Sequence, residues 1–190
     1  MRVSKEQAAR NRDRIIEVAS REFRDKGFDG IGVADLMKSA GLTHGGFYGH
    51  FASKDDLIAE ACAASMDRSA EKWAELANRS PDEAFAALTN AYLLKDHRDH
   101  RETGCTMAAL APDIARQSGR VRERFTRGTS ALLDILARLV PGASAGAKRE
   151  RALATMAGLV GTLVLSRAVN DPEFADEILA AGQAAFGKKD

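Results

Sequence analysis

The sequence predicts an all-α protein. Ala, Leu and Arg, which favour helices, are abundant in the 190-residue chain, whereas aromatic residues make up only 6%. Apolar residues recur at spacings of three and four, and no stretch alternates convincingly between apolar and polar residues as a strand would. With 45% hydrophobic and 29% charged residues, the chain can bury a core, which excludes a wholly disordered or collagen-like protein.

The first helix is expected over about residues 6–26. Ile15, Ala19 and Phe23 repeat every four residues on one face, and Gly27 follows where a C-terminal cap belongs.

Two short helices joined by a tight turn are expected next, over residues 33–40 and 44–50. Gly41 can adopt the positive φ that the turn requires, and Thr43 can cap the second helix. These lengths are typical of a helix-turn-helix that reads DNA, and also of a purely structural corner between two helices.

The remaining helices are predicted from their start and stop signals. Ser53 and Ser118 read as caps, Ser80 to Glu83 as a capping box, and Pro112 as interrupting or ending the helix that starts at Cys105. A polar stretch from His97 to Gly104 is expected to connect two helices. The expected helices are 54–78, 82–96, 105–111 or 105–115, 119–139, 147–169 and 172–187.

The net charge of +1 hides an uneven distribution, because five basic residues stand against two acidic ones within residues 1–14. The basic residues are Arg2, Lys5, Arg10, Arg12 and Arg14. Such an arm beside a neutral body can supply contacts to phosphates, although a merely solvated tail explains the charges as well.

Cysteine content and hydropathy predict a soluble, cytoplasmic protein. Two cysteines cannot form a disulfide framework, and the polar N-terminus has no apolar signal segment. The uncharged stretch 152–166 has 15 residues, short of the roughly 17–25 that a membrane span needs. Its Gly158 and Gly161 suit the close packing of a buried helix pair, so no membrane partner is expected.

The stretch from Val33 to Leu57, VADLMKSAGLTHGGFYGHFASKDDL, resembles the signature of the TetR/AcrR family of bacterial transcriptional regulators. The resemblance extends over about residues 8–60, because Ala40-Gly41, Tyr48, His50-Phe51 and Ser53-Lys54 fall at the family's spacing. It is looser beyond residue 60. Ile31 and Gly32 depart from the usual threonine and serine, so the entry to the second helix lacks its customary cap.

The resemblance implies a homodimeric repressor that leaves a palindromic double-stranded DNA operator when a small effector binds. No Gly-rich phosphate loop, nucleophile elbow or His-Glu-x-x-His motif is found in the sequence, so neither an enzyme nor a cofactor is expected. Residues 1–53 would form the DNA-binding domain, and residues 54–190 the effector-binding and dimerisation domain. Carried over residue by residue, the base-edge contacts are Thr43, His44 and Gly45, and the phosphate contacts are Tyr48, His50 and Lys54.

The last two helices each carry an apolar stripe, which suits either a four-helix interface between two chains or the core of a single chain. The stripes consist of Leu153, Met156, Ala157, Val160, Leu163 and Val164 on one helix, and Phe174, Ile178, Ala181 and Ala185 on the other. A dimer would hold its two recognition helices about 34–36 Å apart, or a multiple of that distance, and so read a palindrome.

Aromatic and sulfur-bearing side chains suggest a cavity for an apolar or aromatic effector among the helices 54–78, 82–96, 105–115 and 119–139. The predicted lining residues are Cys62, Trp73, Tyr92, Cys105, Met107 and Phe125. Ordinary core packing accounts for each of them equally well.

Cys105 follows the polar run and begins a helix near basic residues, an arrangement that lowers a thiol pKa and suits an oxidant or electrophile sensor. The alternative is a buried small apolar residue. His97, His100 and Cys105 lack the paired spacing of a zinc site, and the two histidines are more simply solvated. A helical small-molecule carrier or enzyme that does not bind DNA is the alternative of another class.

Overall fold

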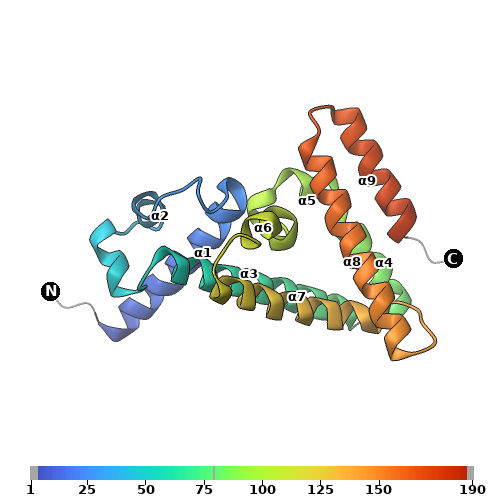
Figure 1. Ribbon diagram of the computed structural model, residues 1–190, viewed down its shortest axis with the longest axis horizontal. Coiled ribbons are helices and arrows are strands. Elements are labelled where there is room, and N and C mark those ends of the chain that lie inside the picture. The colour runs from blue at the N-terminus through green and yellow to red at the C-terminus, as the bar shows by residue number, and fades with distance from the viewer. Residues whose placement is uncertain (1–3, 79, 188–190) are drawn as a thin grey trace.

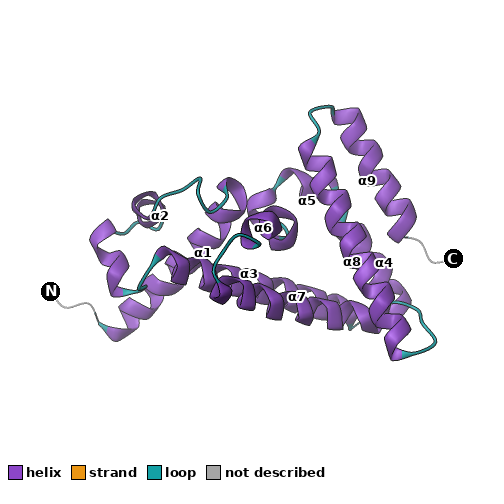
Figure 2. Ribbon diagram, in the orientation of Figure 1, coloured by secondary structure: helices purple, strands orange, loops and turns teal. Residues whose placement is uncertain are grey.

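The computed structural model describes residues 4–78 and 80–187, and these are helical without any strand, as the sequence predicts (Figure 2). The helices are α1 (Lys5–Lys26), α2 (Val33–Ser39), η1 (His44–Gly49), α3 (Lys54–Ala77), α4 (Pro81–Tyr92), α5 (Lys95–Asp99), η2 (Arg101–Thr103), α6 (Thr106–Ile114), α7 (Gly119–Leu139), α8 (Ala145–Ala168) and α9 (Pro172–Phe186), where η marks a 3₁₀ helix.

The long helices α3 and α7 lie side by side and join the two ends of the molecule (Figure 1). At one end α1, α2 and η1 pack around a core that includes Phe23, Leu36 and Phe47. At the other end α4, α7, α8 and α9 enclose a second core, centred on Leu88 and Leu136. The first core continues beyond residue 53 into α3, α6 and α7, so the N-terminal helices rest on the larger part of the chain.

Local signals in the sequence set most helix ends. The hydroxyl of Ser53 accepts from the N–H of Asp56 at 3.1 Å and that of Ser118 from Val121 at 3.5 Å, which confirms both caps. Gly27 ends α1 with φ of 75°. Gly32, as its departure from the family pattern predicts, gives α2 no side-chain cap.

The connection between α4 and α6 differs from the prediction. α4 ends at Tyr92 instead of Asp96, because the fully buried Leu93 anchors the chain as it leaves the helix. The polar run 97–104, which was expected to connect two helices, is itself mostly helical and contributes to α5 and η2.

Of the two expected bounds for the helix after Cys105, the longer one fits: α6 continues to Ile114, and Pro112 removes one backbone donor without ending the helix. One further detail of the prediction is wrong. The capping box at Ser80 does not form, because its hydroxyl bonds the carboxylate of Glu83 at 2.8 Å and caps no backbone N–H.

Within the described residues no helix combines the length and the apolar character that crossing a bilayer requires.

Gly128 lets α7 approach α3 closely. A Cβ placed on Gly128 would lie 2.5 Å from Cβ of Met66, a distance that packed carbon atoms do not reach. Since Cβ of Met66 is fixed by the α3 backbone, rotation of its side chain cannot relieve that contact.

Gly128→Ala is therefore expected to lower the free energy of unfolding by about 1–3 kcal/mol through overpacking, measured by urea denaturation. Gly119→Ala is the matched control, because a Cβ there meets nothing within 4 Å. Equal stability of the two variants would contradict this account of the α3–α7 contact.

Candidate functional site

The helix-turn-helix predicted from the sequence is present as α2, a turn and η1. Gly41 has φ of 66°, and the N–H of Leu42 donates to the carbonyl of Met37 at 2.8 Å to close the turn. The second element is a 3₁₀ helix that ends at Gly49, whereas a regular helix to His50 was expected. Gly45, Gly46 and Gly49 explain the difference, because glycine stabilises an α-helix poorly.

The outer surface of η1 presents the predicted base-contacting residues. Thr43, His44 and Gly45 are all exposed, and Tyr48 is 70% exposed. The ring of Tyr48 packs edge-on against the buried Phe47, with 5.3 Å between centroids. The buried Phe47 thus fixes the position of the Tyr48 ring. These four exposed residues are from here on called the reading face, and within it the rings of His44 and Tyr48 lie 6.4 Å apart.

Two predictions for this region need correction or qualification. The side chain of Thr43 does not cap η1, since its carbonyl, rather than its hydroxyl, accepts from Gly46 N–H at 3.0 Å. Lys54 is turned inward: its ammonium donates to the carbonyls of Phe28 at 2.5 Å and Ile31 at 2.8 Å. Its contact with phosphate stays a prediction, as does that of the half-buried His50.

The basic arm is partly engaged by the protein itself. Arg2 lies outside the described residues. Arg10 and Glu6 are 3.9 Å apart, whereas Arg12 pairs with Glu60 at 3.6 Å and lies 4.9 Å above the ring of Phe51. Such exposed pairs contribute little to stability, so the arginines can exchange them for phosphates.

A cavity of about 280 Å³ opens among α3, α4, α6 and α7 and is closed on one side by the chain between α5 and α6. The predicted residues Trp73, Tyr92, Cys105 and Met107 line it. The full lining is Ser69, Lys72, Trp73, Leu76, Leu88, Ala91, Tyr92, His97, Thr103, Gly104, Cys105, Met107 and Leu132.

Cys62 and Phe125 do not line this cavity, which corrects their expected placement. Cys62 belongs to the first core, where burial raises the pKa of its thiol to about 12. Phe125 packs against both cores at the middle of α7. Helical periodicity placed each on an inward face, but the sequence did not indicate which core that face would meet.

His97 braces the cavity wall, contrary to the prediction that it is solvated. Its Nδ1 donates to the carbonyl of Tyr92 at 2.6 Å, and its Nε2 accepts from the N–H of Cys105 at 3.0 Å. Burial lowers the pKa of His97, so the neutral ring with the proton on Nδ1 is the form that fits both partners. Both nitrogens are used within the protein, which leaves neither free to ligate zinc.

The hydroxyl of Tyr92 is buried beside the cavity without a hydrogen-bond partner, and burial raises the pKa of this phenol. Its ring packs edge-on against Trp73 at 6.3 Å and His97 at 4.8 Å. The cavity therefore has an aromatic wall that the protein itself holds in place.

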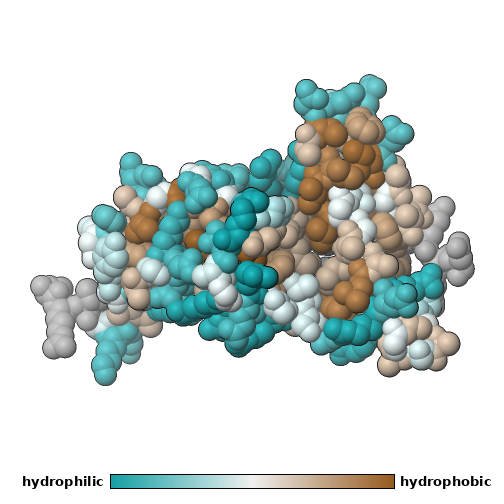
Figure 3. Space-filling view, in the orientation of Figure 1, coloured by the Kyte–Doolittle hydropathy of each residue, from teal (hydrophilic) through white to brown (hydrophobic). Residues whose placement is uncertain are grey.

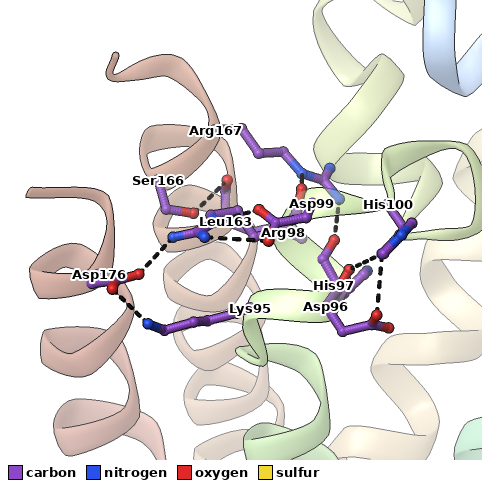
Figure 4. A network of polar contacts seen from close by, with 10 residues as sticks. All are labelled: Lys95, Asp96, His97, Arg98, Asp99, His100, Leu163, Ser166, Arg167 and Asp176. Atoms are coloured by element: carbon purple, nitrogen blue, oxygen red, sulfur yellow. Dashed lines mark hydrogen bonds and ion pairs between the residues drawn. The ribbon is translucent and has the colours of Figure 1, made fainter. Parts of the chain in front are cut away.

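Polar contacts from α8 and α9 hold the segment 95–104 (Figure 4). Arg167 of α8 donates to the carbonyls of Arg98 at 3.0 Å and His97 at 2.5 Å. Asp176 of α9 accepts from Lys95 at 2.5 Å and Arg98 at 2.8 Å. Sequence analysis missed these residues; their only signal was that Arg167 ends an uncharged stretch.

The apolar stripes of α8 and α9 divide between the core and the surface. Met156 and Leu163 are buried in the second core, so the single-chain alternative accounts for them. Leu153 is 50% exposed and Phe174 is 49% exposed. Figure 3 shows apolar residues gathered over the upper ends of these two helices.

A family model described as bacterial regulatory proteins, tetR family, matches residues 15–61, from α1 through η1 into α3. The uncharacterized HTH-type transcriptional regulator YerO of Bacillus subtilis is 28% identical over 122 residues, 62% of this chain and 41% of YerO. The HTH-type transcriptional regulator AcrR of Shigella flexneri is 31% identical over 87 residues, 46% of this chain and 40% of AcrR. The chain thus matches less than half the length of these curated relatives.

The likeness in fold extends over almost the whole chain. A TetR-family transcriptional regulator from Agrobacterium tumefaciens superposes with a TM-score of 0.77 at 22% identity, covering 94% of this chain and 98% of that one. These relatives are named as regulators of transcription and not as enzymes, in agreement with the expectation from the sequence. Residues 15–61 thus match the tetR-family model of bacterial regulatory proteins, and the fold of the chain is that of TetR-family regulators of known structure.

Proposed function

We propose that this protein is a homodimeric repressor that binds a palindromic DNA operator and leaves it when a small apolar or aromatic molecule fills the cavity. The observation that carries the proposal is the reading face: Thr43, His44, Gly45 and Tyr48 stand exposed on a unit whose inner side is anchored by buried Phe47.

The reading face suits the major groove. Thr43 and His44 stand at the start of η1, the end of a recognition element that approaches base edges. The hydroxyl of Tyr48 can donate to a phosphate. A Cβ on Gly45 or Gly49 would meet nothing within 4 Å, so the backbone of η1 is open to close approach by DNA.

Dimerisation through α8 and α9 would cover the apolar surface that one chain leaves exposed. Leu153 and Phe174 are large apolar side chains about half exposed, and Ala157 and Ala181 beside them on the same stripes allow close helix contact. A second copy related by a two-fold axis covers this surface with the same residues.

The cavity fits a small ligand with an aromatic or aliphatic body. Its volume of about 280 Å³ lies at the lower end of the range for ligand sites, and Trp73, Tyr92 and Leu88 offer ring and aliphatic contacts. Ligand binding would favour the conformation in which the two reading faces no longer match successive grooves, a shift of population between two states.

A thiol switch through Cys105 is the second candidate. Cys105 lines the cavity, whereas Cys62 is sealed in the first core with its thiol protonated, so an electrophile that enters the cavity meets only one of the two cysteines.

Tyr48→Phe should weaken binding to a duplex selected from a random-sequence library by about two- to tenfold, because one hydrogen bond to phosphate is lost. The slope of log affinity against log salt should stay the same, since no cation is removed. The matched control is Tyr92→Phe, the same change at the chain's other tyrosine, which is buried at the cavity. Fluorescence anisotropy measures both, and equal affinity of the two variants would count against the reading face.

Leu153→Glu should convert a dimer to a monomer of 20.4 kDa, because a carboxylate would have to be buried without a partner at the interface. Light scattering during size-exclusion chromatography gives the mass. Leu94→Glu, at an apolar residue 51% exposed near α5, is the matched control and should remain dimeric. A wild-type monomer, or dissociation of both variants, would contradict the proposed interface.

The variant Cys105→Ser distinguishes the effector-gated mechanism from the thiol switch. Trp73 is the only tryptophan, so its emission reports occupancy of the cavity by 4-phenylbutanol, a probe of suitable size. For a ligand-gated repressor, the probe should shift Trp73 emission and release DNA equally from the wild type and from Cys105→Ser. Release by hydrogen peroxide from the wild type alone, without release by the probe, would favour the thiol switch.

A further inference from the structure

Arg24, in the last turn of α1, is a buried cation that carboxylates do not pair. Its side chain is 6% exposed, and none of the ion pairs among the described residues includes it. Burial lowers its pKa to about 10, which leaves it charged at neutral pH. A buried guanidinium is stable only when its N–H groups find hydrogen-bond acceptors. The acceptors of Arg24 therefore show which parts of the chain it joins.

Apart from the hydroxyl of Ser20, one turn away on α1 at 3.5 Å, those partners lie outside the DNA-reading end of the chain. Nε and Nη2 of Arg24 both donate to the carbonyl of Glu102 in η2, at 2.9 and 2.5 Å. Nη1 donates to the hydroxyl of Ser65 in α3, which is itself 2.7 Å from the hydroxyl of Thr106 in α6. One side chain of α1 thus holds the chain where η2 passes into α6.

The carbonyl that Arg24 holds, that of Glu102, directly precedes the wall of the cavity in the chain. Thr103, Gly104 and Cys105, which follow Glu102 directly, line the cavity, and the ring of His97 bonds the N–H of Cys105. A Cβ on Gly104 would lie 2.8 Å from the His97 ring, so this wall is packed without slack. A ligand that displaces it therefore also displaces the carbonyl of Glu102.

The other end of the same segment is fixed. Arg167 and Asp176 tie residues 95–98 to α8 and α9, the helices of the proposed interface. With that end held, motion of the cavity wall is directed towards η2 and α1.

We infer that Arg24 is the positioning residue that couples the cavity to the DNA-reading unit, by joining α1 to the segment 95–104. The inference rests on the proposed function. It assigns the coupling to one guanidinium and one carbonyl, and coupling between two sites has to be demonstrated by a measurement that links them.

Thermodynamic reciprocity provides the test without an identified effector. If the cavity wall affects DNA binding, DNA binding must affect the cavity wall to the same degree. Hydrogen exchange measured by mass spectrometry, with and without the selected duplex, follows the amides of residues 95–106. In the wild-type dimer, DNA should slow their exchange on the order of fivefold or more, the lower end of typical allosteric coupling.

Arg24→Met should still bind the duplex but lose this effect of DNA on residues 95–106. Arg21→Gln is the matched control, since Arg21 lies one turn earlier on α1 with its side chain exposed, and it should keep the effect. Arg24→Lys keeps the cation but not the paired donors, and it should reduce the effect even where Arg24→Met fails to fold.

DNA-dependent protection that persists in Arg24→Met and Arg24→Lys would overturn the inference, as would a wild-type protein that binds the duplex with no change at residues 95–106. Failure of the wild type to select any duplex is a different result, which overturns the proposed function and with it the inference.

Discussion

The contact between α3 and α7 is the constraint on which the rest of the structure depends. α3 supplies Leu57, Ile58 and Cys62 to the first core and Met66 to the second, and the two cores share α6 and α7 as well. Gly128 allows α7 to lie against it closely enough for both cores to form along one pair of helices. The end formed by α1, α2 and η1 is therefore not an independent appendage, because its core closes only on residues of α3, α6 and α7.

The cavity lies between the α3–α7 pair and the helices α4 and α6. Its aromatic side chains come from α3 and α4, whereas one of its walls comes from the connection to α6. That wall has polar bonds on both flanks, to α1 through Arg24 and to α8 through Arg167. Apolar packing fixes the volume of the cavity, and hydrogen bonds of one short segment fix its relation to the other parts of the molecule.

The features that the sequence predicted well are those with local causes. Gly27 and Gly41 adopt positive φ because they end a helix and form a turn, and Ser53 caps α3 because the N–H of Asp56 is three residues away. Helical periodicity correctly predicted that Trp73 and Tyr92 line the cavity. The segment 95–104 could not be predicted, because Arg24 and Arg167 bond it across 78 and 70 residues, and polar residues at that distance leave no pattern. His97 looked solvated for the same reason: its partners are carbonyl and amide groups of the backbone.

Two glycines of η1 have a consequence for how this surface tolerates change. Neither Gly45 nor Gly49 has a positive φ, and the space around both is open, so the fold itself would accept alanine at either position. A methyl group at either position would cause no steric clash within the chain, and it would matter only when another molecule binds this surface. The fold therefore places no steric restriction on natural variation at these two positions, and a restriction found there would point to a molecule that binds this surface.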